Sequence, residues 1–248
     1  MTCLVLLPGM DGTGVLFSDF VAALGVPVEP VVIAYPTEQA LDYAQLEAYV
    51  RERLPATVPF VLLGESFSGP IAISIAGNAP RNLIGLILCC SFASNPRPGL
   101  AGLRPFTTLM PGLTSAKLAS PILLGRHSTS ALRRQLNAAL ALVSSSVMRA
   151  RLRAVIDIDV TESLKEVRVS ILYLCATDDR SVPQSASALI SSIAPQTRVV
   201  SVDGPHMLLQ AAAIATAGIV GEFIEQIGVN DRAILAPATP TTAPPSRY

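Results

Sequence analysis

One serine in this sequence lies where a strand-to-helix turn would expose a nucleophile. Ser66 is at the centre of the stretch Gly64-Glu65-Ser66-Phe67-Ser68-Gly69, which follows the apolar run 60–63 and precedes a helical pattern. In such a turn the central residue takes a strained backbone conformation, so its neighbours must be small. A serine hydroxyl there can attack an acyl carbon if a base takes its proton, an acid orients the base and N–H groups hold the oxyanion. An ordinary strand-to-helix turn is the alternative.

Only two histidines are available as the base. His127 lies between Arg126 and Ser128 in a helical segment, where a solvated or helix-capping role is the ordinary expectation. His206 follows Asp203-Gly204-Pro205, in a loop between the last predicted strand and the last predicted helix. That loop lies at the same edge of the sheet as the serine turn, and parallel α/β sheets place their ligands there. His206 is therefore the predicted base.

Two adjacent carboxylates compete for the role of the acid. The strand predicted over residues 169–176 is followed by Thr177, Asp178 and Asp179, and Pro183 starts the next helix. Spacing from this proline favours Asp179, but it does not exclude Asp178. A turn or a helix cap is the ordinary role of either aspartate.

The sequence offers no motif that would hold a cofactor or a metal ion. The segment 8–14 is rich in glycine, but it completes neither G-x-G-x-x-G nor G-K-[ST], so a nucleotide loop is rejected. Cys3, Cys89, Cys90 and Cys175 lie in apolar runs without C-x-x-C spacing, which predicts buried, reduced thiols. We therefore expect no cofactor and no metal site.

Apolar runs and the helical patterns between them predict the elements that position these residues. Strands that are apolar throughout, separated by helices, indicate a parallel sheet covered on both faces. The predicted strands are residues 3–7, 28–34, 60–63, 83–90, 169–176 and 198–202. The predicted helices are residues 17–24, 41–54, 70–77, 131–143, 185–193 and 207–226.

The bulk properties favour one large α/β domain. A chain of 248 residues is short for two independent domains, and with 50% apolar and 15% charged residues it should bury much of itself. Balanced charges give no indication of a nucleic-acid partner. The N-terminus lacks the pattern of a signal peptide, and the longest apolar stretch, 207–220, is too short for a membrane span. A cytoplasmic location is expected.

The order of these residues resembles that of the α/β-hydrolase superfamily, serine esterase type. In that family the nucleophile comes first, the acid second and the histidine last, which matches Ser66, Asp179 and His206. The family's acid motif, an aspartate followed by two residues and Val-Pro, falls on Asp179, Val182 and Pro183. The resemblance implies a Ser-His-Asp catalytic triad.

The same resemblance implies which backbone groups bind the oxyanion. In the family these are the amide of the residue after the nucleophile, here Phe67, and one just after the turn that follows the first core strand, here Met10. The sequence departs from the family pattern twice: Ser68 replaces the second glycine of G-x-S-x-G, and Pro8 replaces the histidine of the usual His-Gly turn. Neither departure removes a backbone donor.

The implied fold is an α/β-hydrolase fold with a truncated, mainly parallel sheet. Family members usually have two strands ahead of the one that feeds the oxyanion turn, whereas that strand begins here at residue 3, so about six strands are expected. Helices should cover both faces, and a helical cap should follow the fourth strand. The expected parts are a core of residues 1–91 and 166–230, a cap of 92–165 and a disordered Pro-rich tail of 231–248.

The charges are polarised although the chain is neutral. Residues 92–156 hold nine of the eighteen basic residues and no acidic one, so this segment carries +9 and the remainder −9. These cations could pair with carboxylates of the core, or they could attract an anionic partner to the cap. For the second interpretation, the predicted binding residues are Arg133, Arg134, Arg149, Arg151 and Arg153.

A basic helical cap over an apolar pocket is similar to the arrangement in pimeloyl-carrier-protein methyl ester esterases. This likeness implies an acyl carrier protein or a coenzyme A ester as a partner. The main hypothesis is a serine hydrolase that cleaves small-molecule carboxylic esters or thioesters through an acyl-enzyme. An acyltransferase with the same triad, a non-catalytic receptor for a small ligand and a carrier-protein or membrane-surface binder are the alternatives.

Overall fold

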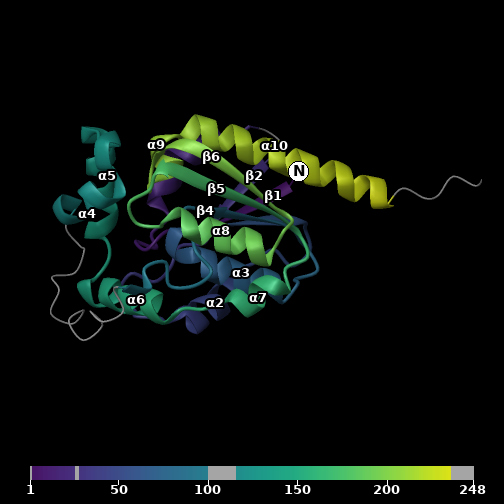
Figure 1. Ribbon diagram of the computed structural model, residues 1–248, viewed down its shortest axis with the longest axis horizontal. Coiled ribbons are helices and arrows are strands. Elements are labelled where there is room, and N and C mark those ends of the chain that lie inside the picture. Colours follow the sequence, from purple (N-terminus) through teal and green to yellow (C-terminus); the bar gives the residue numbers. More distant parts are fainter. Residues whose placement is uncertain (1, 26–27, 100–115, 236–248) are drawn as a thin grey trace, which may run out of the picture.

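The computed structural model describes residues 2–25, 28–99 and 116–235, with residues 116–118 and 229–235 described by their backbone only. One sheet of six parallel strands forms its centre, in the order β2-β1-β3-β4-β5-β6 (Figure 1). This confirms the expected truncated parallel sheet. The strands are β1 (Thr2–Leu7), β2 (Val28–Val32), β3 (Phe60–Glu65), β4 (Leu83–Cys89), β5 (Ser170–Asp178) and β6 (Thr197–Pro205).

The strands differ in burial according to their place in the sheet. Every residue of the central strand β3 is buried, because it has a neighbour on each side and helices on each face. The edge strands β2 and β6 are half-exposed along most of their length. Pro30 of β2 pairs with Leu4 of β1, and an edge strand tolerates this proline because its missing N–H is not needed by a second neighbour.

Two layers of helices bury the two faces of the sheet. Successive residues of a strand point to opposite faces, so Val5 and Leu7 pack on one face and Leu4 and Leu6 on the other. The first face is covered by α2 (Tyr43–Arg51), α3 (Gly69–Gly77), α7 (Thr161–Lys165) and α8 (Gln184–Ile193). The second is covered by α1 (Ser18–Ala23), α9 (Leu208–Ala211) and α10 (Ala213–Leu235).

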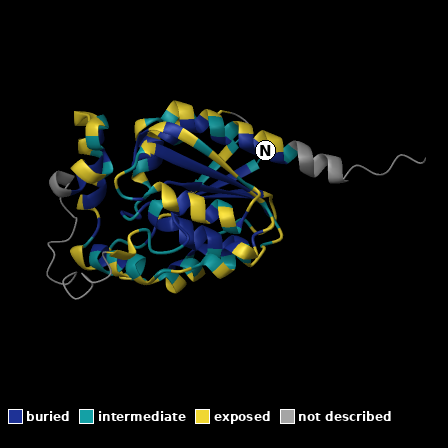
Figure 2. Ribbon diagram, viewed as in Figure 1, coloured by how far each residue is buried: buried dark blue, intermediate teal, exposed yellow. Residues whose placement is uncertain are grey.

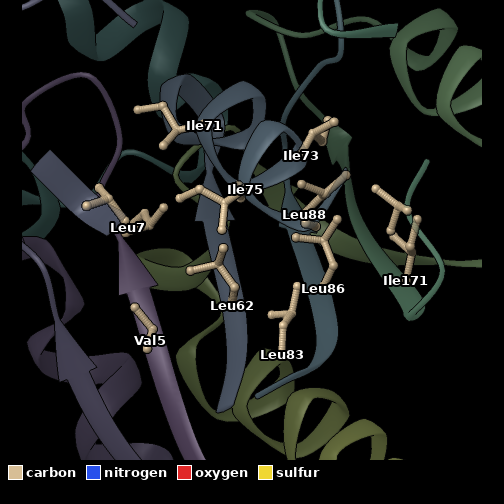
Figure 3. Close-up of a cluster of buried hydrophobic side chains, with 14 of the residues drawn as sticks. Val5, Leu7, Leu62, Ile71, Ile73, Ile75, Leu83, Leu86, Leu88 and Ile171 are labelled. Carbon is tan, nitrogen blue, oxygen red and sulfur yellow. The ribbon is translucent and has the colours of Figure 1, made fainter. Parts of the chain in front are cut away.

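Burial follows this layering (Figure 2). The strands are largely buried, and the helices expose one side and bury the other. On the first face, Ile71 and Ile75 of α3 pack against Leu62 and Leu86 of the sheet (Figure 3). This apolar contact holds the helix that follows Ser66 rigidly on the sheet.

A helical segment, called the cap below, lies between β4 and β5, within the range 92–165 for which a cap was predicted. It contains α4 (Ala116–Leu123), the 3-10 turn η4 (Gly125–His127), α5 (Ser130–Ala141) and α6 (Ser145–Asp157). The helices α4 and α5 stand at the edge of the sheet opposite the N-terminus, which is the edge where the parallel strands end (Figure 1). The cap has an apolar core of its own, around Leu132, Leu136 and Leu140, which reaches Met10 and Met207 of the main domain.

The C-terminal helix differs from its prediction. A single helix over 207–226 was expected, but the chain breaks at Ala212 (φ −126°, ψ 42°) into the short α9 and the long α10. Apolar periodicity continues through such a break, so the sequence pattern does not reveal it. The expected tail begins at residue 231; α10 runs to Leu235, and residues 236–248 lie outside the described part. Among the described helices, none is long and apolar enough to cross a membrane.

Candidate active site

The turn after β3 holds Ser66 in a strained conformation at the carboxyl end of the sheet. Ser66 has a φ of 48°, in the left-handed region that residues other than glycine rarely adopt. It opens the 3-10 turn η2 (Ser66–Ser68), which continues into α3. A Cβ atom on Gly69 would lie 1.7 Å from the Ser91 hydroxyl, which donates a hydrogen bond of 2.6 Å to the Ser66 carbonyl. The close approach explains why only glycine fits at position 69.

His206 and Ser66 lie within hydrogen-bonding distance although 140 residues separate them. The Ser66 Oγ atom is 2.8 Å from His206 Nε2. His206 directly follows β6, and its side chain is only 8% exposed. The carboxyl ends of β3 and β6 therefore place the Ser66 hydroxyl and the His206 imidazole next to each other at the edge of the sheet.

Asp179 completes this chain of hydrogen bonds. Its carboxylate oxygens lie 2.8 and 3.0 Å from His206 Nδ1, and one of them also accepts from the amides of Ser181 and Val182. Burial by itself would raise the pKa of Asp179, but the hydrogen bond and charge of His206 and these two amides outweigh it and lower the pKa. An ionised Asp179 keeps the proton of the imidazole on Nδ1, so that Nε2 can accept the Ser66 proton.

The neighbouring Asp178 points to the cap instead. Its carboxylate lies 3.5 Å from Arg126 Nε, 3.8 Å from His127 Nε2 and 4.0 Å from Arg180 Nε. Because side chains alternate along an extended strand, two consecutive aspartates at the end of β5 face opposite ways. The structure thus brings Asp179, and not Asp178, to His206. His127, the other histidine, contacts this carboxylate and lies in η4 of the cap.

Two backbone turns meet beside Ser66. Leu7 of β1 pairs with Gly64 of β3, so the turn after β1 and the turn after β3 lie next to each other. The Phe67 amide is in the first turn of a helix, where N–H groups have no acceptor within the helix. In the described part of the chain, the Met10 amide donates to no other residue. These are the two amides expected to bind an oxyanion.

Ser68, which departs from the family pattern, ties these turns together. Its hydroxyl donates to the Pro8 carbonyl and, with its proton used there, accepts from the Tyr35 hydroxyl at 2.6 Å. All three groups are buried. A glycine at this position could make neither contact. From the sequence, Ser68 was expected only to be small enough for the turn, because its partners come from distant segments.

Glu65 is a buried carboxyl group that sequence reasoning did not single out. It ends β3 with 6% of its surface exposed, and Gln210 Nε2 donates to it at 3.0 Å. Burial raises the pKa of Glu65 to about 7, in spite of this hydrogen bond. A carboxylate at the end of an otherwise apolar strand was the available signal.

Replacing Glu65 by glutamine should change how stability depends on pH. The folded-state pKa of Glu65 lies above its ordinary value of 4.5, so its contribution to stability is present below pH 4.5 and is lost as the pH rises through 7. Between pH 4.5 and 8 the wild type should lose on the order of 3 kcal/mol of unfolding free energy that Glu65→Gln keeps. Denaturant unfolding across this range measures the difference. Parallel profiles would contradict it, and exposed Glu38→Gln is the matched control.

One group of side chains near the site has the atom types of a metal centre. Cys90, Asp179 and His206 offer ligand atoms within 4.8 Å of one another. Both nitrogens of His206 already contact Ser66 and Asp179, and the hydrogen bond that the Cys90 thiol donates to Cys89, together with burial, raises the pKa of Cys90 well above its ordinary value. A metal ion would therefore have to displace one of these hydrogen bonds and bind a neutral thiol.

The basic residues of the cap fall into three groups. Arg133 and Arg134 line a cavity of about 810 Å³ between α4, η4 and α5, and Arg126 and Arg180 join them there. Arg149 is half-buried and Arg153 is exposed on α6. Arg151, expected on a partner-binding surface, is only 1% exposed because its guanidinium is inserted among backbone carbonyls of the core.

Comparison with known proteins agrees with this architecture. A model of the alpha/beta hydrolase family matches residues 4–218. The enol-lactonase from Burkholderia xenovorans LB400 has 15% identity and a TM-score of 0.78, covering 90% of this chain and 91% of that chain. A thermophilic esterase from Thermogutta terrifontis has 17% identity and a TM-score of 0.78, covering 92% of this chain and 90% of that chain. MenH from S. aureus has 14% identity and a TM-score of 0.76, covering 92% of this chain and 94% of that chain. At such identities the likeness shows a shared fold. No curated protein sequence matches the chain.

Proposed function

We propose, from the premise that the chain belongs to the α/β-hydrolase family, that it is a serine hydrolase that cleaves carboxylic esters through an acyl-enzyme intermediate. The observation that carries the proposal is the hydrogen-bond chain from Ser66 through His206 to Asp179, with distances of 2.8 Å at each link. A nucleophile, a base and an orienting acid in contact are what acyl transfer requires.

In this mechanism His206 Nε2 takes the Ser66 proton as Oγ attacks the acyl carbon. The tetrahedral oxyanion is held by the amides of Met10 and Phe67, and His206 then gives the proton to the leaving alcohol or thiol. Water, activated by the same imidazole, hydrolyses the acyl-enzyme and restores the Ser66 hydroxyl. Asp179 stabilises the imidazolium in both half-reactions without taking its proton.

The surroundings of the site favour an acyl group with apolar character. Met10 and Met207 flank the candidate residues and join the apolar core of the cap, and the Met207 amide donates to the Leu123 carbonyl at 3.2 Å. These contacts hold the C-terminal end of α4 next to His206. Apolar side chains bind the acyl chain of a substrate by removing it from water.

The proposal is tested by measuring hydrolysis of p-nitrophenyl acetate, butyrate and octanoate, and by treating the protein with a fluorophosphonate. We expect turnover of at least one ester, with covalent labelling of the tryptic peptide that contains Ser66. A protein that neither turns over any ester or thioester nor takes the label would instead be a receptor for a small ligand. If added alcohols speed the release of p-nitrophenol and take up the acyl group to form new esters, the protein is an acyltransferase.

We further propose that the acyl group arrives on a phosphate-bearing carrier such as coenzyme A or an acyl carrier protein. The supporting observation is the cavity between α4, η4 and α5, which is lined by Arg126, Arg133, Arg134 and Arg180. Arg126 and Arg180 also pair with Asp178, so Arg133 and Arg134 carry the argument. In the described part of the chain, neither Arg133 nor Arg134 has a carboxylate within salt-bridge distance. Guanidinium groups bind phosphate strongly and in two-pronged geometry.

Reversing the charges of Arg133 and Arg134 should weaken recognition of such a carrier without impairing the chemistry. For Arg133→Glu/Arg134→Glu we expect KM for butyryl-coenzyme A to rise roughly 10-fold or more at low salt, while p-nitrophenyl butyrate turnover stays within about twofold. Arg81→Glu/Arg168→Glu is the control, because it makes the same change in net charge with exposed residues at the opposite edge of the sheet. Equal KM values for both double variants would remove the carrier proposal and leave the hydrolase proposal standing.

A further inference from the structure

Arg151 is the largest side chain that the described core encloses completely. It belongs to the cap helix α6, is 1% exposed and reaches out of the cap into the main domain. Arginine is seldom buried unless its charge and its N–H groups find partners. In the described part of the chain no carboxylate lies within salt-bridge distance of it. The charge of Asp11 acts to raise the pKa of Arg151, but the groups that accept its hydrogen bonds are neutral.

Those partners are backbone carbonyls of two loops at the carboxyl edge of the sheet. Arg151 Nη1 donates to the carbonyls of Met10 and Asp11, at 2.8 and 2.7 Å, and Nη2 donates to the Pro36 carbonyl at 3.0 Å. Gly12 (φ 70°) leaves the room for this group, since a Cβ atom there would lie 2.5 Å from Nη1. The turn after β1 and the guanidinium therefore fit each other closely.

The remaining carbonyls of the same turn are also held. Ser68 donates to the Pro8 carbonyl, and the Tyr35 amide donates to the Gly12 carbonyl at 2.7 Å. With the two bonds from Arg151, four of the five carbonyls from residue 8 to residue 12 have donors from outside the turn. The fifth, of Gly9, accepts from the Gly12 amide at 3.0 Å and closes the turn on itself.

These bonds restrain the orientation of the Met10 amide. The Met10 N–H lies in the same peptide plane as the Gly9 carbonyl, which accepts from the Gly12 amide, while Arg151 holds the next two carbonyls, those of Met10 and Asp11. Arg151 therefore restrains the Met10 amide through the turn of residues 9–12, and not through a bond to its own peptide plane. An oxyanion donor acts only if it points at the place where the charge develops, and it is most effective when no reorganisation is needed. Arg151, on the cap helix α6, supports the turn that sets this orientation, so the position of α6 affects the geometry of the donor.

We propose that Arg151 is a positioning residue that holds the Met10 amide in its oxyanion-binding orientation from the cap. The proposal rests on the hydrolase function proposed above. It makes the docking of α6 on the main domain a condition for a formed oxyanion site. An α6 displaced from the turn would leave the Ser66, His206 and Asp179 contacts in place but release one of the two oxyanion donors.

The test uses Arg151→Lys, which keeps the charge but cannot reach three carbonyls with one ammonium group. We expect kcat for p-nitrophenyl butyrate to fall about 10- to 100-fold, with KM within about threefold and an unchanged pH profile, because a transition-state contact is lost while the base is intact. Inhibition by a trifluoromethyl ketone, which forms a tetrahedral adduct on serine, should weaken by a similar factor. Hydrogen exchange in peptides covering residues 8–14 should become faster.

Leu140→Ala is the matched control for destabilisation. Leu140 is 4% exposed in the apolar core of the cap, so its truncation should lower the melting temperature without changing kcat below that temperature. If Arg151→Lys behaves like Leu140→Ala, with a lower melting temperature but unchanged kcat and unchanged exchange at residues 8–14, the positioning role is overturned. If the wild type hydrolyses no ester, the hydrolase proposal fails, and the exchange of residues 8–14 alone decides whether Arg151 holds the turn.

Discussion

Replacing Ser66 with alanine is expected to lower kcat for p-nitrophenyl ester hydrolysis by about 10⁴- to 10⁶-fold. The change removes the atom that attacks the acyl carbon and leaves the turn intact, because the hydrogen bonds that hold the turn use the Ser66 carbonyl and the Ser68 hydroxyl. The melting temperature should therefore change little. Steady-state kinetics on freshly purified protein, with unfolding followed by circular dichroism, gives both quantities.

His206→Ala should cause a loss of the same size. The two residues act as one unit, so the double variant Ser66→Ala/His206→Ala should be about as slow as either single variant. Ser74→Ala is the control. Ser74 lies on α3, the helix that follows the Ser66 turn, and its hydroxyl donates to Glu47 at 2.6 Å, so its loss should leave kcat within about twofold. A Ser66→Ala protein as fast as the wild type would exclude the acyl-enzyme mechanism.

The fold could be predicted from the sequence because its signals are local. Runs such as 60–63 and 83–90 are apolar throughout, which is the pattern of strands covered on both faces, and the structure has strands there. The break between α9 and α10 could not be predicted in this way, since apolar residues continue on both sides of Ala212. Element types followed from composition, whereas a break in a helix depends on contacts with the rest of the chain.

The candidate site could be predicted in outline for a similar reason. Parallel strands end at one edge of a sheet, so residues that follow three different strands, such as Ser66, Asp179 and His206, are brought near each other by topology. Their contacts depend on side-chain direction, which the sequence does not contain. The sequence alone therefore could not separate Asp178 from Asp179.

The buried charges are the part that sequence reasoning missed. Arginines in a helix are ordinarily solvated, and the sequence does not distinguish Arg151 from Arg149 or Arg153. Arg151 is buried because the glycine at position 12 leaves room and because carbonyls of distant loops accept its hydrogen bonds. The arginines of the cap therefore differ in role: Arg151 packs the cap onto the core, whereas Arg133 and Arg134 line an open cavity.

Matched substitutions of Asp178 and Asp179 should have very different effects on kcat. Asp179→Asn should lower kcat by about 10⁴-fold, while Asp178→Asn should stay within a few-fold of the wild type. The reason is the proton on the imidazole. An asparagine amide that donates to His206 Nδ1 forces the proton onto Nε2, and an Nε2 that carries a proton cannot accept the one from Ser66.

Asp178→Asn changes charge and hydrogen bonding by the same amount but removes only contacts with Arg126, His127 and Arg180. The Arg126 and Arg180 side chains are 67% and 52% exposed, whereas Asp178 and His127 are 26% and 21% exposed, so loss of the two arginine pairs should cost little stability. Asp178→Asn should also loosen η4 of the cap, which lines the basic cavity. Any effect of this variant should therefore be on KM for butyryl-coenzyme A rather than on kcat. Equal losses of kcat for the two variants would contradict the assignment of Asp179, because the two carboxylates share their chain neighbourhood and differ in whether they touch His206.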